Sequence, residues 1–186
     1  QKLGLVTDAL FTDYDNDGWI DLMVAGQGMP LLLFHNDQGV LTESTPTLFQ
    51  ENVGWWNGLT GADFDQDGDI DYVATNYGGN HLYHQNGTDF VGLYGADFDR
   101  NGGYDLLLSD RAMNKDGTSS EYPHFQRKDT EKQLIMVKDV YPLHGDFGKV
   151  TMLQFLTDFP TKELTALKAN FLRSVWIENL GDGNFS

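Results

Sequence analysis

Short apolar segments alternate with polar turns along much of the chain. The stretch DYVATNY, residues 71–77, follows an acidic loop and resembles a β-strand rather than an amphipathic helix. Segments 31–43, 81–90 and 175–186 each contain an apolar or aromatic strand, an Asn near a Gly-containing turn, and another apolar residue. Each unit therefore predicts strand, acidic loop, strand, turn, strand, tight turn and strand, which is a four-stranded antiparallel blade.

The acidic loop of this unit occurs three times, beginning at Asp13, Asp63 and Asp97. The loops are 50 and then 34 residues apart, within the usual range for propeller blades. Because a closed propeller needs at least about four blades, the pattern predicts a mainly β chain that forms a partial or open β-propeller. Within a single repeat domain, 1–186, we expect blade 1 at 1–50, blade 2 at 51–92, and blade 3 formed by 93–110 with 174–186.

The region 111–173 interrupts the repeats and predicts a small helical insertion within blade 3. Its first part, RAMNKDGTSSEYPHFQRK, is rich in turn residues and predicts a loop. Helices are expected at 129–141, where Asp129 or Thr130 can cap the start, and at 148–159 and 161–170, on either side of Pro160.

Composition narrows the classes of partner. The chain has 186 residues and a formal net charge of −16, so nucleic acid and anionic membrane surfaces would repel it. There is no cysteine, hence no disulfide framework, and no apolar run approaches the length of a membrane span. Ten of the 12 Lys and Arg residues lie between Arg111 and Arg173, which sets this region apart. Gln1 begins no signal peptide, and we expect a mature fragment or a piece of a longer protein.

The stretch ADFDQDGDID, residues 62–71, sets five aspartates around Gly68. Carboxylates this close repel one another unless protonation, solvation or a cation relieves the repulsion. Calcium takes six to eight oxygen ligands, and aspartates at alternate loop positions can all point at one ion. The EF-hand also requires a Glu at position twelve and flanking helices, but position twelve here is Ala74.

The loops instead follow D-x-[DN]-x-[DN]-G-x-x-D, with side-chain ligands at positions one, three, five and nine and a backbone carbonyl ligand at position seven. Solvated acidic turns are the alternative, but such a turn needs one Asp and a Gly rather than four aligned acids. The third loop has one carboxylate fewer and should bind Ca2+ most weakly. The candidate ligands are Asp13, Asp15, Asp17, Trp19, Asp21, Asp63, Asp65, Asp67, Asp69, Asp71, Asp97, Asp99, Asn101, Gly103 and Asp105.

These motifs resemble the FG-GAP or VCBS repeats, which build the propeller of integrin α-subunits and of many bacterial surface proteins. The resemblance rests on G-A-D-F-D-x-[DN]-G-x-x-D at 61–71 and 95–105, on the variant at 12–21, and on N-x-G-D-G-x-F at 179–185. It covers roughly 1–110 and 174–186, and it implies structural calcium in a loop between the first two strands of a blade. The pair Trp55 and Trp56 is also similar to ASPIC/UnbV-associated members.

The histidines and aromatic residues favour structural roles. His81 and His84 are three apart, so a strand would place them on opposite faces, and His35 and His84 occupy equivalent strand positions. No nucleophile motif accompanies His124 or His144. The aromatic residues Trp55, Trp56, Tyr77, Tyr83 and Tyr94 could form a platform for a sugar, but packing between blades is favoured.

Three hypotheses follow. The first is a non-enzymatic, calcium-binding module of a bacterial surface or secreted protein, with a protein or glycan ligand at the blade faces or at the insertion 111–173. The second is a calcium-dependent polysaccharide lyase or hydrolase on the same architecture, in which paired carboxylates act as acid and base. The third is a purely architectural segment. A fold alone does not decide among them.

Overall fold

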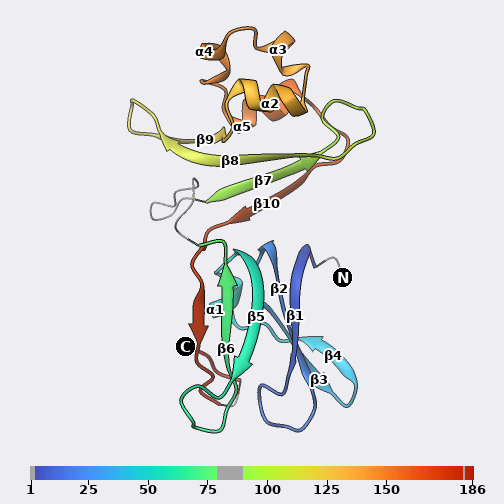
Figure 1. Cartoon of the computed structure of the whole chain (residues 1–186), viewed down its shortest axis with the longest axis vertical. Coiled ribbons are helices and arrows are strands. Elements are labelled where there is room, and N and C mark those ends of the chain that lie inside the picture. The colour runs from blue at the N-terminus through green and yellow to red at the C-terminus, as the bar shows by residue number, and fades with distance from the viewer. Residues whose placement is uncertain (1–2, 79–89, 182) are drawn as a thin grey trace. The chain divides into compact units, whose positions relative to one another are not determined.

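The computed structural model of the chain describes residues 3–78, 90–181 and 183–186. It divides into two compact units, unit 1 with residues 1–82 and 169–186, and unit 2 with residues 83–168. Figure 1 shows their strands and helices. Strands make up 42% and helices 15%, which confirms a mainly β fold with open antiparallel sheets.

The first blade lies in unit 1 and contains four antiparallel strands, β1 Leu5–Thr12, β2 Asp21–Met29, β3 Leu32–Asp37 and β4 Val40–Glu43. Strand β2 pairs with β1 on one side and with β3 on the other, and β3 pairs with β4. The short helix α1, Thr47–Gln50, follows. This order is the strand, loop and hairpin sequence predicted for a blade.

The second blade combines distant parts of the sequence. Strands β5, Gly54–Ala62, and β6, Asp71–Asn76, form an antiparallel pair, and β11, Val175–Ile177, pairs with β6. The turn after β11 brings Ser186 beside Glu178, where they exchange two backbone hydrogen bonds. Blade 2 is therefore completed by 174–186, and the prediction that this segment completes a third blade was wrong. The predicted strand segment 81–90 lies outside the described residues apart from Phe90.

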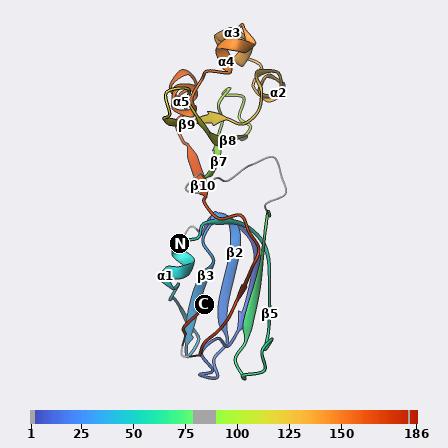
Figure 2. The same ribbon diagram turned by 90° about the vertical axis from the view of Figure 1, so that its left-hand side faces the viewer.

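The strands of unit 1 form one sheet, and an apolar core packs against this sheet. Strand β2 also pairs with β5, so the order is β11-β6-β5-β2-β3-β4, with β1 on β2. Figure 2 shows α1 beside this sheet. The core contains Met23, Leu33, Trp56 and Tyr72, which are at most 2% exposed. Burial of Trp55 as well confirms that this aromatic pair packs in the interior.

Unit 2 carries the third acidic loop on a four-stranded sheet of order β10-β7-β8-β9. Strands β7, Val91–Ala96, and β8, Asp105–Met113, flank the loop, as predicted. Strand β9, Ser119–Pro123, forms a hairpin with β8, and β10, Thr165–Ala169, pairs with β7.

Four helices pack on the unit 2 sheet: α2 Arg127–Gln133, α3 Val137–Val140, α4 His144–Phe147 and α5 Met152–Asp158. Their core combines Tyr94 and Leu107 from the sheet with Leu134, Val137 and Phe155 from the helical region. The sheet and the helices therefore share one hydrophobic core, and this region is more than an excursion from a blade.

Three predictions for 111–173 were wrong in part. The loop expected at 111–128 contains the β8–β9 hairpin, whose turn has Gly117 at φ 83° and a hydrogen bond from the Asn114 N–H to the Thr118 carbonyl. The helix expected at 161–170 is the edge strand β10, because pairing with β7 outweighs a weak helical propensity. The helix expected at 129–141 is split into α2 and α3, with Leu134 and Val137 both buried at the break. The helix expected at 148–159 is confirmed as α5.

Candidate metal-binding loops

The first acidic loop, residues 13–21, joins β1 to β2 and folds around its own carboxylates. The N–H groups of Asp17 and Gly18 donate to the two oxygens of Asp13, at 3.1 and 3.0 Å. The Asp17 N–H also lies 3.3 Å from Asp15 Oδ1. Two residues with left-handed backbone, Asn16 at φ 58° and Gly18 at φ 89°, make the tight turn that aims these N–H groups inward. The backbone thus partly offsets the negative charge of the loop.

The second and third loops repeat this arrangement. The Gly68 N–H donates to Asp63 at 3.2 Å, and the Gly102 N–H donates to Asp97 at 3.1 Å. In each loop the fifth residue accepts a hydrogen bond from the N–H of the seventh, at 2.7, 2.9 and 2.6 Å in chain order. Positive φ values recur at the fourth and sixth positions, 67° and 103° in the second loop and 60° and 86° in the third. Three separate sequences therefore adopt one backbone conformation.

The ninth residue anchors each loop to its blade. Asp21 and Asp71 are 0% exposed and Asp105 is 7% exposed. One oxygen of each accepts a hydrogen bond from the N–H of the second loop residue, at 3.1, 3.2 and 3.0 Å respectively. A buried carboxylate needs such donors because burial without them is costly.

Two asparagines complete the first and second loops in the same way. The Asn36 N–H donates to Asp21 Oδ1 at 2.7 Å, and the Asn179 N–H donates to Asp71 Oδ1 at 2.9 Å. Each side-chain amide also donates to the carbonyl of the residue before that aspartate, at 2.7 and 3.3 Å. These two asparagines therefore mark the same point of the repeat, although they are far apart in sequence.

The third loop is completed differently. Leu106 follows the ninth residue, and its backbone faces the side chain of Gln133 from α2. In the amide orientation that satisfies both groups, the Gln133 carbonyl accepts from the Leu106 N–H at 2.9 Å and its amide donates to the Leu106 carbonyl at 3.2 Å. Within the loop, Asn101 Nδ2 donates to Asp99 Oδ2 at 2.9 Å. One carboxylate oxygen is thus already engaged by the residue that replaces an aspartate.

The electrostatics of the loops favour a cation. Burial raises the pKa of Asp21, although the N–H groups of Asn36 and Tyr14 donate to it and oppose the change. Desolvation also raises the pKa of Asp65, and the negative charges of Asp67 and its neighbours add to this effect. Both shifts favour the protonated form of these two carboxyl groups in the absence of a cation.

The structure brings together three candidate ligands of each loop, whereas Asp17 and Asp71 lie outside these carboxylate groups. Carboxylate oxygens lie within 4.8 Å of one another in three groups, which are Asp13, Asp15 and Asp21, then Asp63, Asp65 and Asp67, then Asp97, Asp99 and Asp105. Oxygen donors in such number suit a hard divalent cation, so the residues fit Ca2+, and such an ion would supply the positive charge that the loops lack. At position seven, Trp19 is 46% exposed. At the same position of the second loop, the Asp69 carboxylate accepts a hydrogen bond from Asn16 Nδ2 at 2.6 Å.

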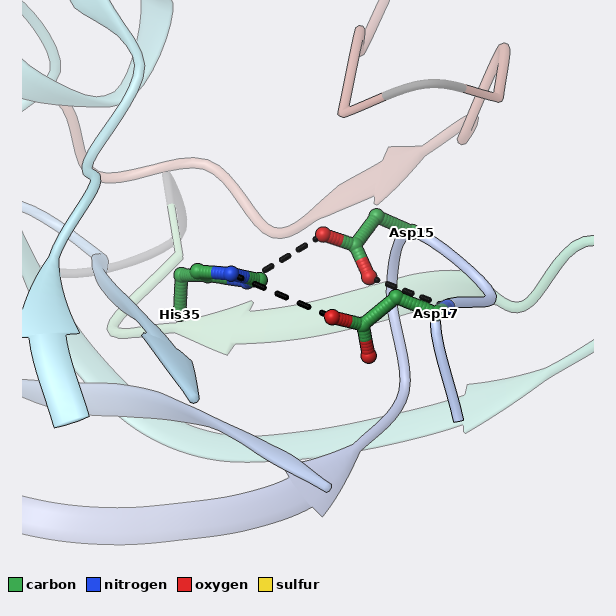
Figure 3. A group of neighbouring side chains, drawn as sticks. All are labelled: Asp15, Asp17 and His35. Atoms are coloured by element: carbon green, nitrogen blue, oxygen red, sulfur yellow. Dashed lines mark hydrogen bonds and ion pairs between the residues drawn. The ribbon is translucent and has the colours of Figure 1, made fainter. Parts of the chain in front are cut away.

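Sequence reasoning treated His35 only as a structural residue of the third strand. It does lie in β3, but its imidazole points at the first loop and groups with Asp15 and Asp17 (Figure 3). The repeat pattern could have indicated this position of His35. Asn36 donates to the ninth residue of the first loop, so the residue before Asn36 lies close to that loop. The remaining described histidines lie elsewhere; for example, His124 Nδ1 is 2.7 Å from Asp110.

The family model described as FG-GAP-like repeat matches residues 13–74, which contain the first and second loops. This part of the chain is therefore similar to an FG-GAP-like repeat, and the match supports the FG-GAP/VCBS resemblance drawn from the motifs. None of the curated proteins and none of the solved structures matches the chain. Among the described residues, no helix is long and apolar enough to cross a membrane.

Proposed function

We propose that this chain is a calcium-stabilised repeat module that acts as a binding or scaffolding domain and not as an enzyme. The observation that carries the proposal is the common backbone of the three loops, which holds carboxylates close together at matching positions. Coordination of a cation would relieve the repulsion among these carboxylates in the same way in each loop. The family match at 13–74 supports the repeat architecture.

Calcium would act mainly on unit 1. Unit 1 contains two Lys and Arg residues against fifteen Asp and Glu residues, a net charge of −13, whereas unit 2 contains ten against thirteen, a net charge of −3. Each bound ion replaces repulsion between carboxylates by coordination and fixes the connection between the first two strands of a blade. The hairpins and the outer faces of the sheets then remain available for a partner.

The proposed setting is the surface of a bacterial cell or the space around it. Extracellular calcium modules work with dissociation constants of about 10⁻⁴ to 10⁻³ M, so loops with exposed carboxylates need not bind tightly to stay filled there. A protein or a glycan is the proposed ligand, at the blade faces or at the region 111–173. The strong negative charge disfavours nucleic acid as a partner.

The test is a thermal melt of metal-free protein titrated with Ca2+ and, separately, with Mg2+. At a hundredfold excess over the dissociation constant, one occupied loop contributes about 2.7 kcal/mol, so we expect the midpoint to rise by on the order of 10 °C. The double variant Asp65→Asn with Asp67→Asn should lose much of this rise. Asp116→Asn is the matched control, because Asp116 accepts hydrogen bonds from Thr118 in an exposed turn outside the clusters.

An unchanged midpoint with either ion would overturn the calcium proposal. An equal calcium response in the Asp65/Asp67 variant and in the Asp116 control would overturn the assignment to the second loop. Screening the calcium-loaded protein against a panel of plant and microbial glycans addresses the remaining part. Cleavage of any glycan would contradict the non-enzymatic role, whereas binding without cleavage would support it.

A further inference from the structure

Among the residues that the structure describes, the first loop is the one with an imidazole grouped with its carboxylates. Figure 3 shows the imidazole of His35 facing the carboxylates of Asp15 and Asp17. His35 Nδ1 lies 3.2 Å from Asp15 Oδ2 and 3.4 Å from Asp21 Oδ1, and Nε2 lies 3.9 Å from Asp17 Oδ2. The Nδ1 atom is buried and makes no hydrogen bond within the described structure.

The hydrogen bonds of the loop backbone leave one carboxylate oxygen of Asp15 and one of Asp17 facing the imidazole of His35. Backbone N–H groups engage the Oδ1 atoms of Asp15 and Asp17, at 3.3 and 2.7 Å, whereas the Oδ2 atom of each faces His35. Donor atoms around a first-row transition ion, with bonds of about 2.0–2.2 Å, lie about 3 to 4 Å apart. One ion binds a single nitrogen of an imidazole, and one donor atom from each of the three side chains lies within 4.8 Å of the other two, so modest side-chain rotations would bring the three donors to bonding separation.

The strand register shows that the second blade has no imidazole at the place of His35. Leu22, which follows the ninth residue of that loop, pairs with Phe34, and the equivalent Tyr72 pairs with Ile177. The next residues along β3 and β11 are therefore equivalent, and they are His35 in the first blade and Glu178 in the second. A nitrogen donor occupies the place where the second blade has a carboxylate.

We propose that Asp15, Asp17 and His35 form a mixed nitrogen–oxygen site for a first-row transition ion such as Zn2+ or Co2+. Imidazole suits these ions, whereas Ca2+ prefers oxygen ligands alone. The inference rests on the proposed function in one respect, that the loops bind cations, and it divides them by chemistry. The first loop selects a transition ion, and the second and third loops select calcium.

The test uses Co2+ as a coloured probe, added to the full chain in the presence of excess Ca2+ that fills the oxygen-only loops. We expect one Co2+ per chain, with visible absorption characteristic of nitrogen ligation. His35→Gln should weaken Co2+ and Zn2+ by at least about tenfold to a hundredfold, the loss typical even for outer partners of a metal site. His124→Gln is the matched control, since that imidazole also contacts a carboxylate, that of Asp110, but lies outside the acidic loops.

A second variant, His35→Glu, distinguishes loss of the metal site from a general loss of folding. His35→Glu restores a carboxylate like that of the second blade, so it should lose the Co2+ absorption while it keeps or gains calcium stabilisation. Equal Co2+ binding by the wild type and by His35→Gln would overturn the inference and leave the imidazole as a counter-charge only. That result would leave the calcium proposal intact, because the calcium proposal fails only when added calcium does not change the melting midpoint of the metal-free protein.

Discussion

Units 1 and 2 contain the same acidic loop but complete it with different partners. In unit 1 a third strand pairs beside the ninth aspartate, either β3 or β11, and contributes an asparagine N–H to it. In unit 2 the equivalent backbone at Leu106 meets the side chain of Gln133 from a helix. The loop conformation is nevertheless the same in both units.

This difference shows that the loop is a local structure, whereas the blade is not. The hydrogen bonds that shape each loop join residues at most seven positions apart. The partner that completes the blade can come from 15 residues away, as with Asn36, or from 108 residues away, as with Asn179. Substitutions that affect either the local hydrogen bonds of a loop or its long-range partner, but not both, test this difference between loop and blade.

The largest effect is expected for Asn179→Ala. Asn179 is 1% exposed, and its amide donates to the carbonyls of Tyr14 and Ile70. Its removal leaves buried acceptors unpaired, at about 1–3 kcal/mol each, so we expect a loss of about 3 kcal/mol in urea unfolding. Asn36→Ala, the equivalent change in the first blade, should cost about 1 kcal/mol because that bond is exposed. Equal costs would contradict the bridging role of Asn179.

Gly68→Ala and Gly102→Ala form the next pair. Both glycines have positive φ, 103° and 86°, and a Cβ at either position would meet no atom within 4 Å. The expected cost is therefore backbone strain alone, about 1–2 kcal/mol, and it should be equal in the two units. Urea unfolding monitored separately for each unit measures it, and a clearly smaller cost for Gly102→Ala would mean that the third loop is not held in the same conformation.

Gln133→Ala tests the partner that completes the third loop in unit 2. It removes the contact with the Leu106 backbone, and we expect a loss of about 1 kcal/mol. Hydrogen exchange of the Leu106 N–H should become faster, while amides of β2 and β6 should be unaffected. A uniform change across both units would show that Gln133 acts on the whole chain instead of on the third loop.

The smallest expected effect concerns pH. The folded-state pKa values of Asp21 and Asp65 are raised. At pH values between the unfolded-state and folded-state pKa of each group, the folded chain therefore binds more protons than the unfolded chain. For these groups stability is lost as pH rises and is regained as pH falls from 7 towards about 4. Protonation of Asp21 and Asp65 should therefore not destabilise the metal-free protein in melts at mildly acidic pH, whereas the calcium-dependent gain in stability should shrink there, because ligands must be deprotonated. Parallel curves with and without calcium would contradict this.

The local features could be predicted from the sequence, and the long-range ones could not. The D-x-[DN]-x-[DN]-G-x-x-D pattern located all three loops and their flanking strands, because Gly at position six and Asp at position nine act within the loop. The pairing of β11 with β6 could not be derived, because β-pairing depends on tertiary contacts that no local pattern encodes. The Asn179 motif did contain the missing signal, since it matches Asn36 in its relation to a preceding strand.

Asn179 also determines the order in which the two blades can be finished. The backbone donor to the ninth aspartate of the first loop is present once residue 36 has been synthesised, whereas Asp71 must wait for a donor 108 residues later. Closing so long a segment is slow, because its entropy must be lost before the contact forms. During synthesis the second loop therefore remains without its last backbone donor until nearly the whole of this sequence has been made. In that interval, a bound cation would be the main source of positive charge that offsets the repulsion among the carboxylates of the second loop.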